Sequence, residues 1–569
     1  MSARKAKTNK RLNILMLALV AFASCLVLLT RLAQIILVKQ VNNVDLVNYG
    51  QTQEMRSSIT EARRGTIFDQ NGQPIAMDTT SYSVYGILAA PGSDNVIQDP
   101  DRTAKVLAKY LKVSQDSLLN QIVTSKAEQI EFGPAGTNLS AATKEAIEKE
   151  KLPGIVFVSQ TSRIYINDYF ASHLIGYSRP TQEKSDLTAN ILQGQSGIEK
   201  TYDDRLSGRK KYRELSEQGI KQDYISGQDL YLTLNSRVQN ILEDLTNQVD
   251  KTYQPQAINA YLVEVKTGKL VAATQRPTFN LNTRQGIDKQ WKNLLVEEAY
   301  EPGSTLKILL MAEAYDQHVY TAKESFQSGQ IKIYDQTIRD YNQYGWGKIP
   351  FEQALPRSSN VGMVLLAQRI GLEKWLKKLD QFGFGHSTQS GLPNEVAGRI
   401  EQENKFSQIT TSFGQGIATT PIQLLQAFTS IGNNGKMMKI QYVDHIESSQ
   451  VYQPKELGQV VSADAAQQVL QLMRQAVDQP YGTAQAFKNS QVNIAAKTGT
   501  AEIANPNGGG YLSGPNDYYN SVVGFFPAEN PKYMLYLSIK QVKQTQGKTG
   551  SQILAEIFNP LVDFVMIKQ

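Results

Sequence analysis

The 569-residue sequence contains a single cysteine, Cys25, and only four histidines. One cysteine cannot form an intrachain disulfide, and a cysteine-based metal site is excluded as well. The histidines, at positions 173, 318, 386 and 445, lack the short spacing that zinc ligands show. Any catalysis must therefore use hydroxyls, lysines, carboxylates or amides, and we expect neither a metal ion nor a cofactor.

The net charge of +6 is not spread evenly along the chain. Five positive charges, and no acidic residue, lie within the first eleven residues: Arg4, Lys5, Lys7, Lys10 and Arg11. Removing these five from +6 leaves +1 for all the rest. The remainder has no basic stripe of the kind that a phosphate backbone requires, so we expect no nucleic-acid partner.

An apolar segment follows the basic cluster: residues 12–30 carry no charge and are bounded by Arg11 and Arg31. Nineteen residues of helix just cross a bilayer core of about 30 Å. We predict a cytoplasmic tail over 1–11 and one transmembrane anchor over 12–38, with the remainder outside the cell. The alternative is a cleaved signal peptide, but the apolar segment continues past the small residues around Cys25 where cleavage would occur.

The length exceeds what one hydrophobic core can organise, which favours at least two exported domains. Residues 40–228 alternate predicted strands (64–76, 82–88) with predicted helices (101–123, 139–151) and contain no pairing of nucleophile and base. We interpret this region as a scaffold, or pedestal.

The sequence pattern changes at residue 229, and the segment 229–569 differs from the one before it. The patterns predict a strand at 229–234, a helix at 236–249 with a serine cap, a hairpin at 257–274, a helix-rich block at 291–435, strands at 490–503, 518–526 and 533–541, and a helix at 550–566. This order predicts an α+β fold with a mainly antiparallel sheet flanked by helices and an additional helical block.

Three short motifs occur in order within 229–569: Ser304-Thr305-Leu306-Lys307, Ser358-Ser359-Asn360 and Lys497-Thr498-Gly499-Thr500. Each is weak alone, because similar strings occur at 207–210, 93–95, 266–268 and 548–550. Context separates them. The four similar strings lie in polar stretches or turns, whereas the three motifs border apolar runs.

Ser304 precedes an apolar run and therefore lies at a predicted helix N-terminus, where backbone N–H groups and the helix dipole favour negative charge. Lys307, three residues later, shares its helix face. A serine needs a neighbouring base to become a nucleophile, and a lysine can serve if burial lowers its pKa. The alternative is an ordinary helix cap beside an exposed lysine.

The other two motifs also allow both functional and structural interpretations. Ser358 and Asn360 lie at a loop-to-helix junction, where Ser358 could relay a proton and Asn360 could hold a substrate amide, or where the serines could simply cap a helix. Lys497 and Gly499 share one face of a predicted strand, with Thr498 and Thr500 on the other. A glycine in a strand allows a ligand to approach the backbone.

Together, the three motifs resemble those of penicillin-binding proteins and class A β-lactamases. Further segments resemble class B penicillin-binding proteins, in particular the streptococcal division type called 2X: 64–69, 194–206, 275–277, 300–304 and 412–416. The resemblance spans nearly the whole chain. It implies the penicillin-recognising serine transpeptidase fold over 229–569, a pedestal over 40–228 and an N-terminal anchor in the cell membrane.

The resemblance also implies the roles of the site residues. Ser304 would attack the D-Ala-D-Ala amide of a peptidoglycan stem peptide, with Lys307 as general base and Ser358 as proton relay. Four groups would bind substrate or shape the site's field: Asn360, Lys497, Thr500 and the strand backbone at Thr498-Gly499. β-Lactams would acylate Ser304. Partners would include a polytopic glycosyltransferase and other membrane proteins of the division machinery.

Two departures from the streptococcal type stand out. The chain ends after its terminal helix, without the small C-terminal domains of that type, and Glu502 occupies a position where an uncharged glutamine is unremarkable. Three rivals fit less well. A β-lactamase needs a deacylating carboxylate and no anchor, a β-lactam sensor needs a cytoplasmic signalling part, and a bifunctional enzyme needs acidic glycosyltransferase motifs that 40–228 lacks.

Overall fold

The structure is a computed structural model of the chain. It describes residues 16, 18–31, 33, 40–41, 44–45, 62–90, 94–180, 192–212, 222–342, 344–449, 451–505, 508 and 510–567. The chain forms two compact units, one comprising 1–61, 183–189 and 210–224, and the other comprising all remaining residues. The predicted tail over 1–11 and the end of the predicted anchor, over 34–38, lie outside the described residues.

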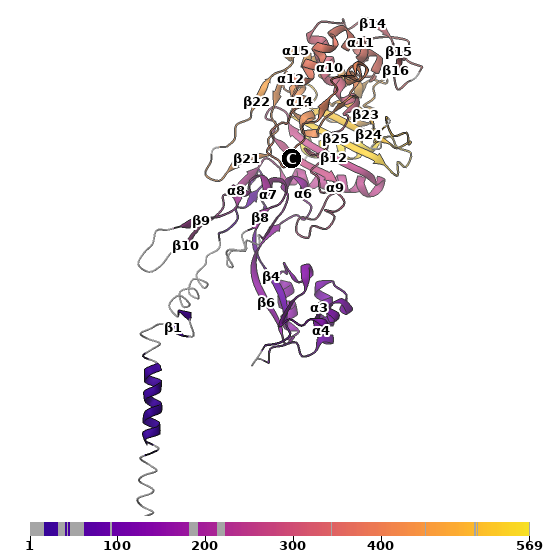
Figure 1. Ribbon diagram of the computed structural model, residues 1–569. Helices are drawn as coiled ribbons and strands as arrows, with labels where there is room; N and C mark the ends of the chain where they lie inside the picture. Colours follow the sequence, from indigo (N-terminus) through magenta and orange to yellow (C-terminus); the bar gives the residue numbers. More distant parts are fainter. Residues whose placement is uncertain are drawn as a thin grey trace, which may run out of the picture. The chain divides into compact units, whose positions relative to one another are not determined.

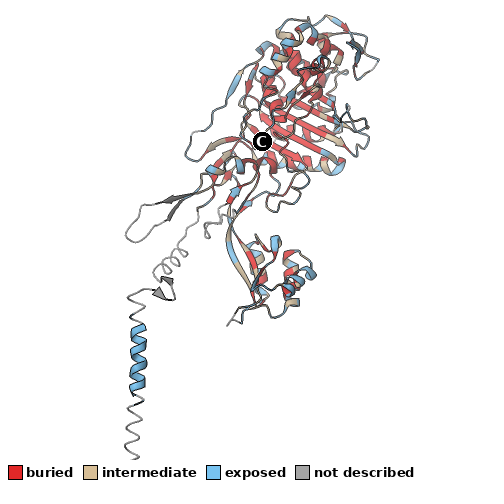
Figure 2. Cartoon of the chain, in the orientation of Figure 1, coloured by how far each residue is buried: buried red, intermediate tan, exposed pale blue. Residues whose placement is uncertain are grey.

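The described part of the first unit contains an apolar helix, Ala18–Arg31. Its large apolar side chains, such as Leu19, Phe22 and Leu29, are more than half exposed, and Figure 2 shows the helix in pale blue along its length. No protein covers these side chains among the described residues, which suits a helix inserted in lipid. Two two-residue strands follow, β1 (Gln40–Val41) and β2 (Val44–Asp45).

The second unit begins with a long antiparallel pair of strands. Strand β4 (Pro74–Ile87) pairs with β6 (Ile155–Tyr165) from Ala76↔Tyr165 to Gly86↔Ile155. Helices α3 (Pro100–Leu111), α4 (Gln115–Thr124) and α5 (Ala141–Lys149) and strand β5 (Gln129–Glu131) enclose a small core at one end of this pair (Figure 1). At the other end, β3 (Ile67–Phe68) joins β4 to β11 (Leu230–Leu232) and β21 (Val443–Ile446).

The centre of the second unit is a five-stranded antiparallel sheet. Its order is β13 (Leu270–Arg276), β12 (Pro255–Glu264), β25 (Tyr533–Val542), β24 (Tyr518–Phe526) and β23 (Ala495–Glu502). Strands from the beginning and the end of the segment 229–569 therefore lie side by side, as the pink β12 and yellow β25 show in Figure 1.

Both faces of this sheet are covered (Figure 2). Helices α9 (Ser236–Tyr253) and α16 (Gly550–Ile567) pack on the face that carries Ile258 and Leu537. The opposite face carries Tyr261 and Tyr536 and packs on the helical block. Burial on two faces explains why these strands are almost continuously apolar. Helix α16 is long and apolar enough to span a membrane, but its packing makes it a core helix.

The helical block consists of α10 (Lys307–Asp316), α11 (Asn360–Ile370), α12 (Leu372–Gln381), α13 (Lys405–Thr410), α14 (Pro421–Gly432) and α15 (Ala463–Asp478). Short elements connect it: η2 (Gly303–Leu306), η3 (Phe351–Gln353), η4 (Thr411–Phe413), η5 (Gln485–Phe487), β14 (Ser325–Gln327), β15 (Gln330–Ile333), β16 (Gln336–Arg339), β17 (Lys348–Pro350), β18 (Arg399–Ile400), β19 (Ile417–Ala418), β20 (Lys436–Met438) and β22 (Glu456–Gln459). The other short elements lie within residues 133–225 and are η1 (Gly133–Gly136), α6 (Ser172–Ile175), β7 (Ser178–Pro180), β8 (Leu192–Gly194), α7 (Gly197–Thr201), α8 (Asp203–Leu206), β9 (Arg209–Tyr212) and β10 (Gln222–Ile225).

The α+β fold and most predicted elements are confirmed, with four corrections. The predicted helix over 101–123 is two helices, separated at Lys112, whose φ of 55° is left-handed. The predicted strand at 82–88 is the continuation of β4. Helix α9 is capped by Asn235, not by Ser236. Strand β23 begins at Ala495 rather than at 490.

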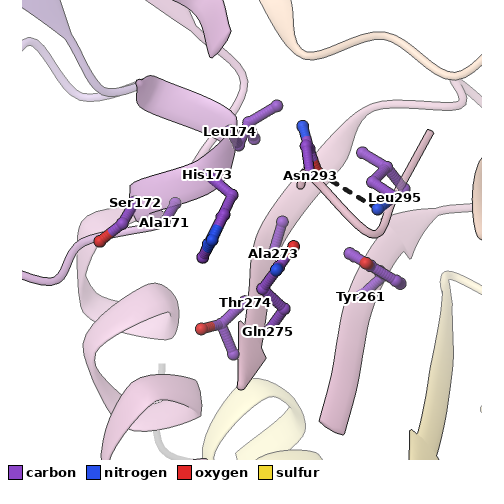
Figure 3. A pocket seen from close by; sticks show the side chains of 10 residues that line it. All are labelled: Ala171, Ser172, His173, Leu174, Tyr261, Ala273, Thr274, Gln275, Asn293 and Leu295. Carbon is purple, nitrogen blue, oxygen red and sulfur yellow. Dashed lines mark hydrogen bonds between the residues drawn. The ribbon is translucent and has the colours of Figure 1, made fainter. Parts of the chain in front are cut away.

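A small cavity of about 10 Å³ lies between α6 and strands β12 and β13, beside His173 (Figure 3). His173 is only 5% exposed, and its Nε2 lies 2.8 Å from the carbonyl oxygen of Gln290. Its Nδ1 has no hydrogen-bond partner among the described residues. Burial lowers the pKa of His173 to about 4, and the nearby Arg276 also opposes protonation. The ring is therefore neutral in the folded protein.

This burial predicts a loss of stability in mild acid. The unfolded chain takes up a proton at His173 near its ordinary pKa of 6.5, whereas the folded chain does so only near about 4. Stability is therefore complete above pH 6.5 and falls as the pH drops towards 4, by about 3 kcal/mol for this group. In urea unfolding at several pH values, His173→Asn is expected to lose less stability than wild type across this window. Parallel losses in the two proteins would contradict the expectation.

Candidate active site

Ser304 lies in the 3₁₀ turn η2, immediately before α10. Gly303 has a φ of 59°, and a Cβ there would lie 2.8 Å from the carbonyl oxygen of Thr500. A Cβ on Gly414 would lie 2.0 Å from the carbonyl oxygen of Gly303. Glycines at these two positions thus let the Ser304 turn pack between β23 and the turn after η4. Ser304 itself remains half-buried, at the wall of a cleft.

Lys307 is fully buried, which excludes the interpretation as an exposed lysine beside a cap. Its Nζ donates to the carbonyl oxygen of Ser358 (2.7 Å) and to Oδ1 of Asn360 (2.7 Å), and lies 3.3 Å from Oγ of Ser358. Burial lowers the pKa of Lys307 to about 7, although Asp340 partly opposes this shift. A neutral amine at Lys307 is therefore accessible at neutral pH.

In the Ser358-Ser359-Asn360 motif, the middle residue caps a helix and the two flanking residues contact Lys307. Ser359 caps α11, with its Oγ accepting from the backbone N–H of Gly362 (3.0 Å). Ser358 has a left-handed φ of 57°, and Asn360 donates through Nδ2 to the carbonyl oxygen of Arg339 (2.8 Å). The cap therefore holds the backbone in place while the two flanking side chains meet Lys307.

Lys497 approaches Ser358 from the sheet. It is fully buried, and its Nζ lies 2.9 Å from Oγ of Ser358 and donates to the carbonyl oxygen of Thr498 (2.6 Å). Burial first, and then the neighbouring Lys307, hold the pKa of Lys497 well below its usual value. The Ser358 hydroxyl thus lies between two lysine nitrogens, and the charge of Lys307 favours a neutral amine at Lys497.

The side chains of β23 alternate between the two faces of the strand, as the sequence predicts. Thr498, Thr500 and Glu502 line the cleft, whereas Lys497 points into the protein. A glycine is needed at position 499 for a different reason from the one that the sequence suggests. A Cβ on Gly499 would lie 2.3 Å from Oγ of Ser521 and 3.1 Å from Cγ2 of Thr305. Its small size is needed for the Ser304 turn to pack on the strand.

The cleft has a volume of about 910 Å³, which is enough for a peptide. It brings together residues from all three motifs, namely Ser304, Ser358, Asn360, Thr498 and Thr500. Elements far apart in the sequence supply the remaining walls, including β16, α13, η5 and the start of α16. The three motifs that the sequence singles out therefore converge on one open site.

Three groups at this site were missed by reasoning from sequence. Asp340, 2% exposed, accepts from Oγ of Ser359 (2.9 Å) and from the N–H groups of Val361 (3.0 Å) and Gly329 (2.8 Å), and so fixes the start of α11. Thr483 is contacted by Thr498, with 3.2 Å between the two hydroxyl oxygens. Gln415 lines the cleft, and only its place in the segment 412–416 could have indicated it.

Of the similar strings elsewhere, one contributes to the cleft, because Thr549 lines it. Thr267 and Gly268 form the turn between β12 and β13, where Gly268 has a φ of 72°. The string at 548–550 leads into α16, with Thr549 forming hydrogen bonds to Gln552. Of the string at 93–95, Ser93 lies outside the described residues, and Asn95 accepts from the N–H of Gly154 (2.8 Å). Residues of all three predicted motifs line the cleft, whereas the other described residues of the similar strings do not.

Comparisons with known proteins agree with this arrangement. Residues 258–563 match the penicillin binding protein transpeptidase domain, and residues 59–232 match the penicillin-binding protein dimerisation domain. The chain is similar to stage V sporulation protein D of Bacillus subtilis (28% identical over 510 residues, 85% of this chain and 75% of that protein). It is also similar to peptidoglycan D,D-transpeptidase FtsI of Escherichia coli (26% over 535 residues, 92% of this chain and 86% of that protein).

Among solved structures, penicillin binding protein 2X from Streptococcus thermophilus superposes with a TM-score of 0.73 and 31% sequence identity, covering 90% of this chain and 80% of that one. A serine turn beside two buried lysines on an antiparallel sheet is the arrangement of the penicillin-recognising serine enzymes. Within that class, the chain belongs to the penicillin-binding protein transpeptidase family, as a class B member with a dimerisation domain.

Proposed function

We propose that the chain is a peptidoglycan D,D-transpeptidase of cell division that works through an acyl-enzyme on Ser304. The observation that carries this proposal is the buried Lys307, whose pKa of about 7 leaves a neutral amine one helical turn from a cleft-lining serine. The family supplies the substrate class, peptidoglycan stem peptides, and the inhibitors, β-lactams, which imitate the D-Ala-D-Ala end.

In the acylation half-reaction, the Lys307 amine takes the Ser304 hydroxyl proton as Oγ bonds to the carbonyl carbon of the penultimate D-alanine. The C–N bond then breaks, and the leaving amine receives a proton through the Ser358 hydroxyl, which both lysines contact. Asn360 orients the substrate amide, and Thr500 binds the terminal carboxylate. Backbone N–H groups of Ser304 and Thr500 stabilise the oxyanion, each worth about 3 kcal/mol.

In the second half-reaction, an amino group of a neighbouring stem peptide attacks the ester carbonyl. The Ser304–carbonyl bond breaks, Ser304 regains its proton, and a new amide cross-links the two stems. Lys497 supports both steps by holding the Ser358 hydroxyl in place.

Mass spectrometry after incubation with penicillin tests the nucleophile, with Ser304→Ala as the control. A stable adduct on the peptide containing Ser304, absent from the control, supports the proposal. Intact drug without an adduct would contradict it, and hydrolysed drug without an adduct would favour a β-lactamase.

Glu502 gives a prediction for drug sensitivity. It lines the cleft two residues beyond Thr500, with its Oε2 accepting from Nε2 of Gln415 (2.9 Å). Its charge repels β-lactams that carry two carboxylates. Glu502→Gln is expected to speed their acylation about two- to fivefold, as exposed charge interactions are worth up to about 1 kcal/mol. Stopped-flow rate constants measure this, and equal rates in the two proteins would contradict it.

The basic N-terminal sequence and the apolar helix Ala18–Arg31 support a proposal for the membrane topology. We propose a cytoplasmic N-terminus, a single anchor over 12–38, a pedestal over 40–228 and a transpeptidase domain over 229–569 outside the cell, at the septum. In a Cys25→Ala background, an impermeant thiol reagent should label Ser490→Cys but not Ser2→Cys on intact cells. Labelling of both would contradict this topology.

The pedestal has no catalytic residues in this scheme, and we propose that it holds the catalytic domain away from the membrane and binds a polytopic glycosyltransferase of the division machinery. This proposal rests on analogy with the family. Cross-linking in cells from exposed pedestal positions, compared with positions on α12, tests it. Cross-links from α12 alone would contradict it.

A further inference from the structure

The cleft wall formed by β23 ends in a carboxylate. Thr498, Thr500 and Glu502 follow one another on the cleft side of this strand, and residues two apart along a strand are about 7 Å apart. Thr498 and Thr500 carry hydroxyls, whereas Glu502 carries a negative charge. The wall that receives the donor peptide is thus continued, one strand repeat farther, by an acidic group.

A second carboxylate stands behind the first. Glu301, three residues before Ser304, accepts through Oε1 from the N–H of Gly416 (2.9 Å) and the hydroxyl of Tyr511 (3.2 Å). Its Oε2 is closed to solvent and has no hydrogen-bond partner among the described residues. Burial raises the pKa of Glu301, and the charge of Glu502 raises it further. The two carboxylates are therefore close enough to repel each other.

No cation within the described residues balances this pair at ion-pair distance. Arg399 is near enough only to lower the pKa of Glu301 slightly. The other charged groups that line the cleft are Arg339, beside Asn360, and Asp340, whose oxygens are occupied by the start of α11. The end of the cleft at Glu502 and Gln415 is therefore acidic, with a carboxylate that faces the substrate.

We propose that Glu502 binds the ammonium group of the acceptor stem peptide, which then gives a proton to the Lys307 amine and attacks the ester carbonyl on Ser304. This inference rests on the proposed function, and it names the second substrate's recognition group. An alkyl amine has an ordinary pKa near 10.4 and arrives almost entirely as an ammonium ion. A carboxylate that lines the same cleft as Ser304 attracts this cation.

An ammonium on the third residue of the donor stem has the same chemistry and could occupy the same place. The arms of the experiment separate these two sources. A purely structural role for Glu502, as the partner of Gln415, is the remaining interpretation. It predicts a change in thermal stability with no preference for charged over neutral peptides.

The test uses the full chain in detergent with two peptides that differ in one charge: Nα-acetyl-L-Lys-D-Ala-D-Ala and its Nε-acetylated form. Binding is measured by NMR titration in a Ser304→Ala background, which prevents turnover, with and without Glu502→Gln. Glu373→Gln, on the exposed start of α12 and away from the cleft, is the matched control. The free amine is expected to bind about two- to fivefold more tightly than its acetylated form, and Glu502→Gln is expected to abolish this ratio.

A kinetic arm then assigns the source with active enzyme and a D-alanyl thioester donor that carries no amine. For an acceptor site, Glu502→Gln raises the KM for the amine acceptor by a larger factor than it changes the rate of acylation by the thioester donor. Two results would overturn the inference. In the first, Glu502→Gln slows only acylation by a donor that carries an amine. In the second, both peptides bind equally tightly to the enzyme that retains Glu502. The penicillin adduct on Ser304 is scored separately, so a failure of the nucleophile assignment is distinguishable from a failure at Glu502.

Discussion

Replacing Lys307 by methionine is expected to slow acylation by penicillin about 10²- to 10⁴-fold, the usual contribution of a general base. The methionine fills a similar volume, and it leaves no charge in a position that is fully buried. The folded state should therefore be at least as stable as wild type, because the buried ammonium costs free energy. Rate constants with a fluorescent penicillin measure the loss, and melting temperatures show that it does not arise from unfolding.

The pH dependence distinguishes a base from a merely structural lysine. The amine acts only when neutral, and its pKa is about 7. The acylation rate constant should be level above pH 8 and fall about tenfold per pH unit well below 7. Lys436→Met, which removes an exposed lysine paired with Glu456 at 3.0 Å, is the control and should keep both rate and profile. A flat wild-type profile between pH 5.5 and 9 would contradict the role of Lys307.

The sequence alone singled out three motifs whose residues line one cleft, because each motif borders an apolar run and so lies at the end of a buried element. It could not predict Asp340. This residue stabilises α11 through groups 19 and 21 positions later, and no local spacing marks such a contact. Nor could it predict that Gly499 is needed for packing, because the neighbouring Ser521 and Thr305 belong to other elements.

The same limit appears in the fold. Elements with strong local signals, such as the hairpin of β12 and β13 and the terminal helix α16, were predicted within two residues. Helices α3 and α4 were merged, because the left-handed residue between them is a lysine rather than a glycine. The association of β3 with β11 joins positions more than 160 residues apart, and only the folded chain reveals it.

The ionic cluster at the base of the β4–β6 pair is the clearest case of a long-range feature. Glu199 is fully buried and pairs with Arg64 (2.7 Å) and Arg163 (2.8 Å). Asp203 and Asp78 pair with the outer nitrogens of the same arginines, at 2.6 and 3.1 Å. Burial alone would raise the pKa of Glu199, but Arg163 and Arg64 outweigh it and hold this pKa below its usual value.

Glu199→Gln is expected to lower the free energy of unfolding by about 3–5 kcal/mol, because two arginines with almost no solvent access lose their central counter-charge. Urea unfolding of the full chain in detergent, followed by circular dichroism, measures the loss. Glu148→Gln, which breaks an exposed i,i+4 pair with Lys144, is the matched control and should cost about 0.5 kcal/mol or less.

Acylation by penicillin separates this cluster from the active site. None of its five residues lines the catalytic cleft, so Glu199→Gln should keep the wild-type acylation rate below its melting temperature. The double variant Glu199→Leu, Arg163→Leu should cost less than the sum of its single variants, because it removes both charges of a pair together. Additive losses would mean that the charges act independently. A loss in Glu199→Gln no larger than in Glu148→Gln would mean that the paired charges only offset their own burial.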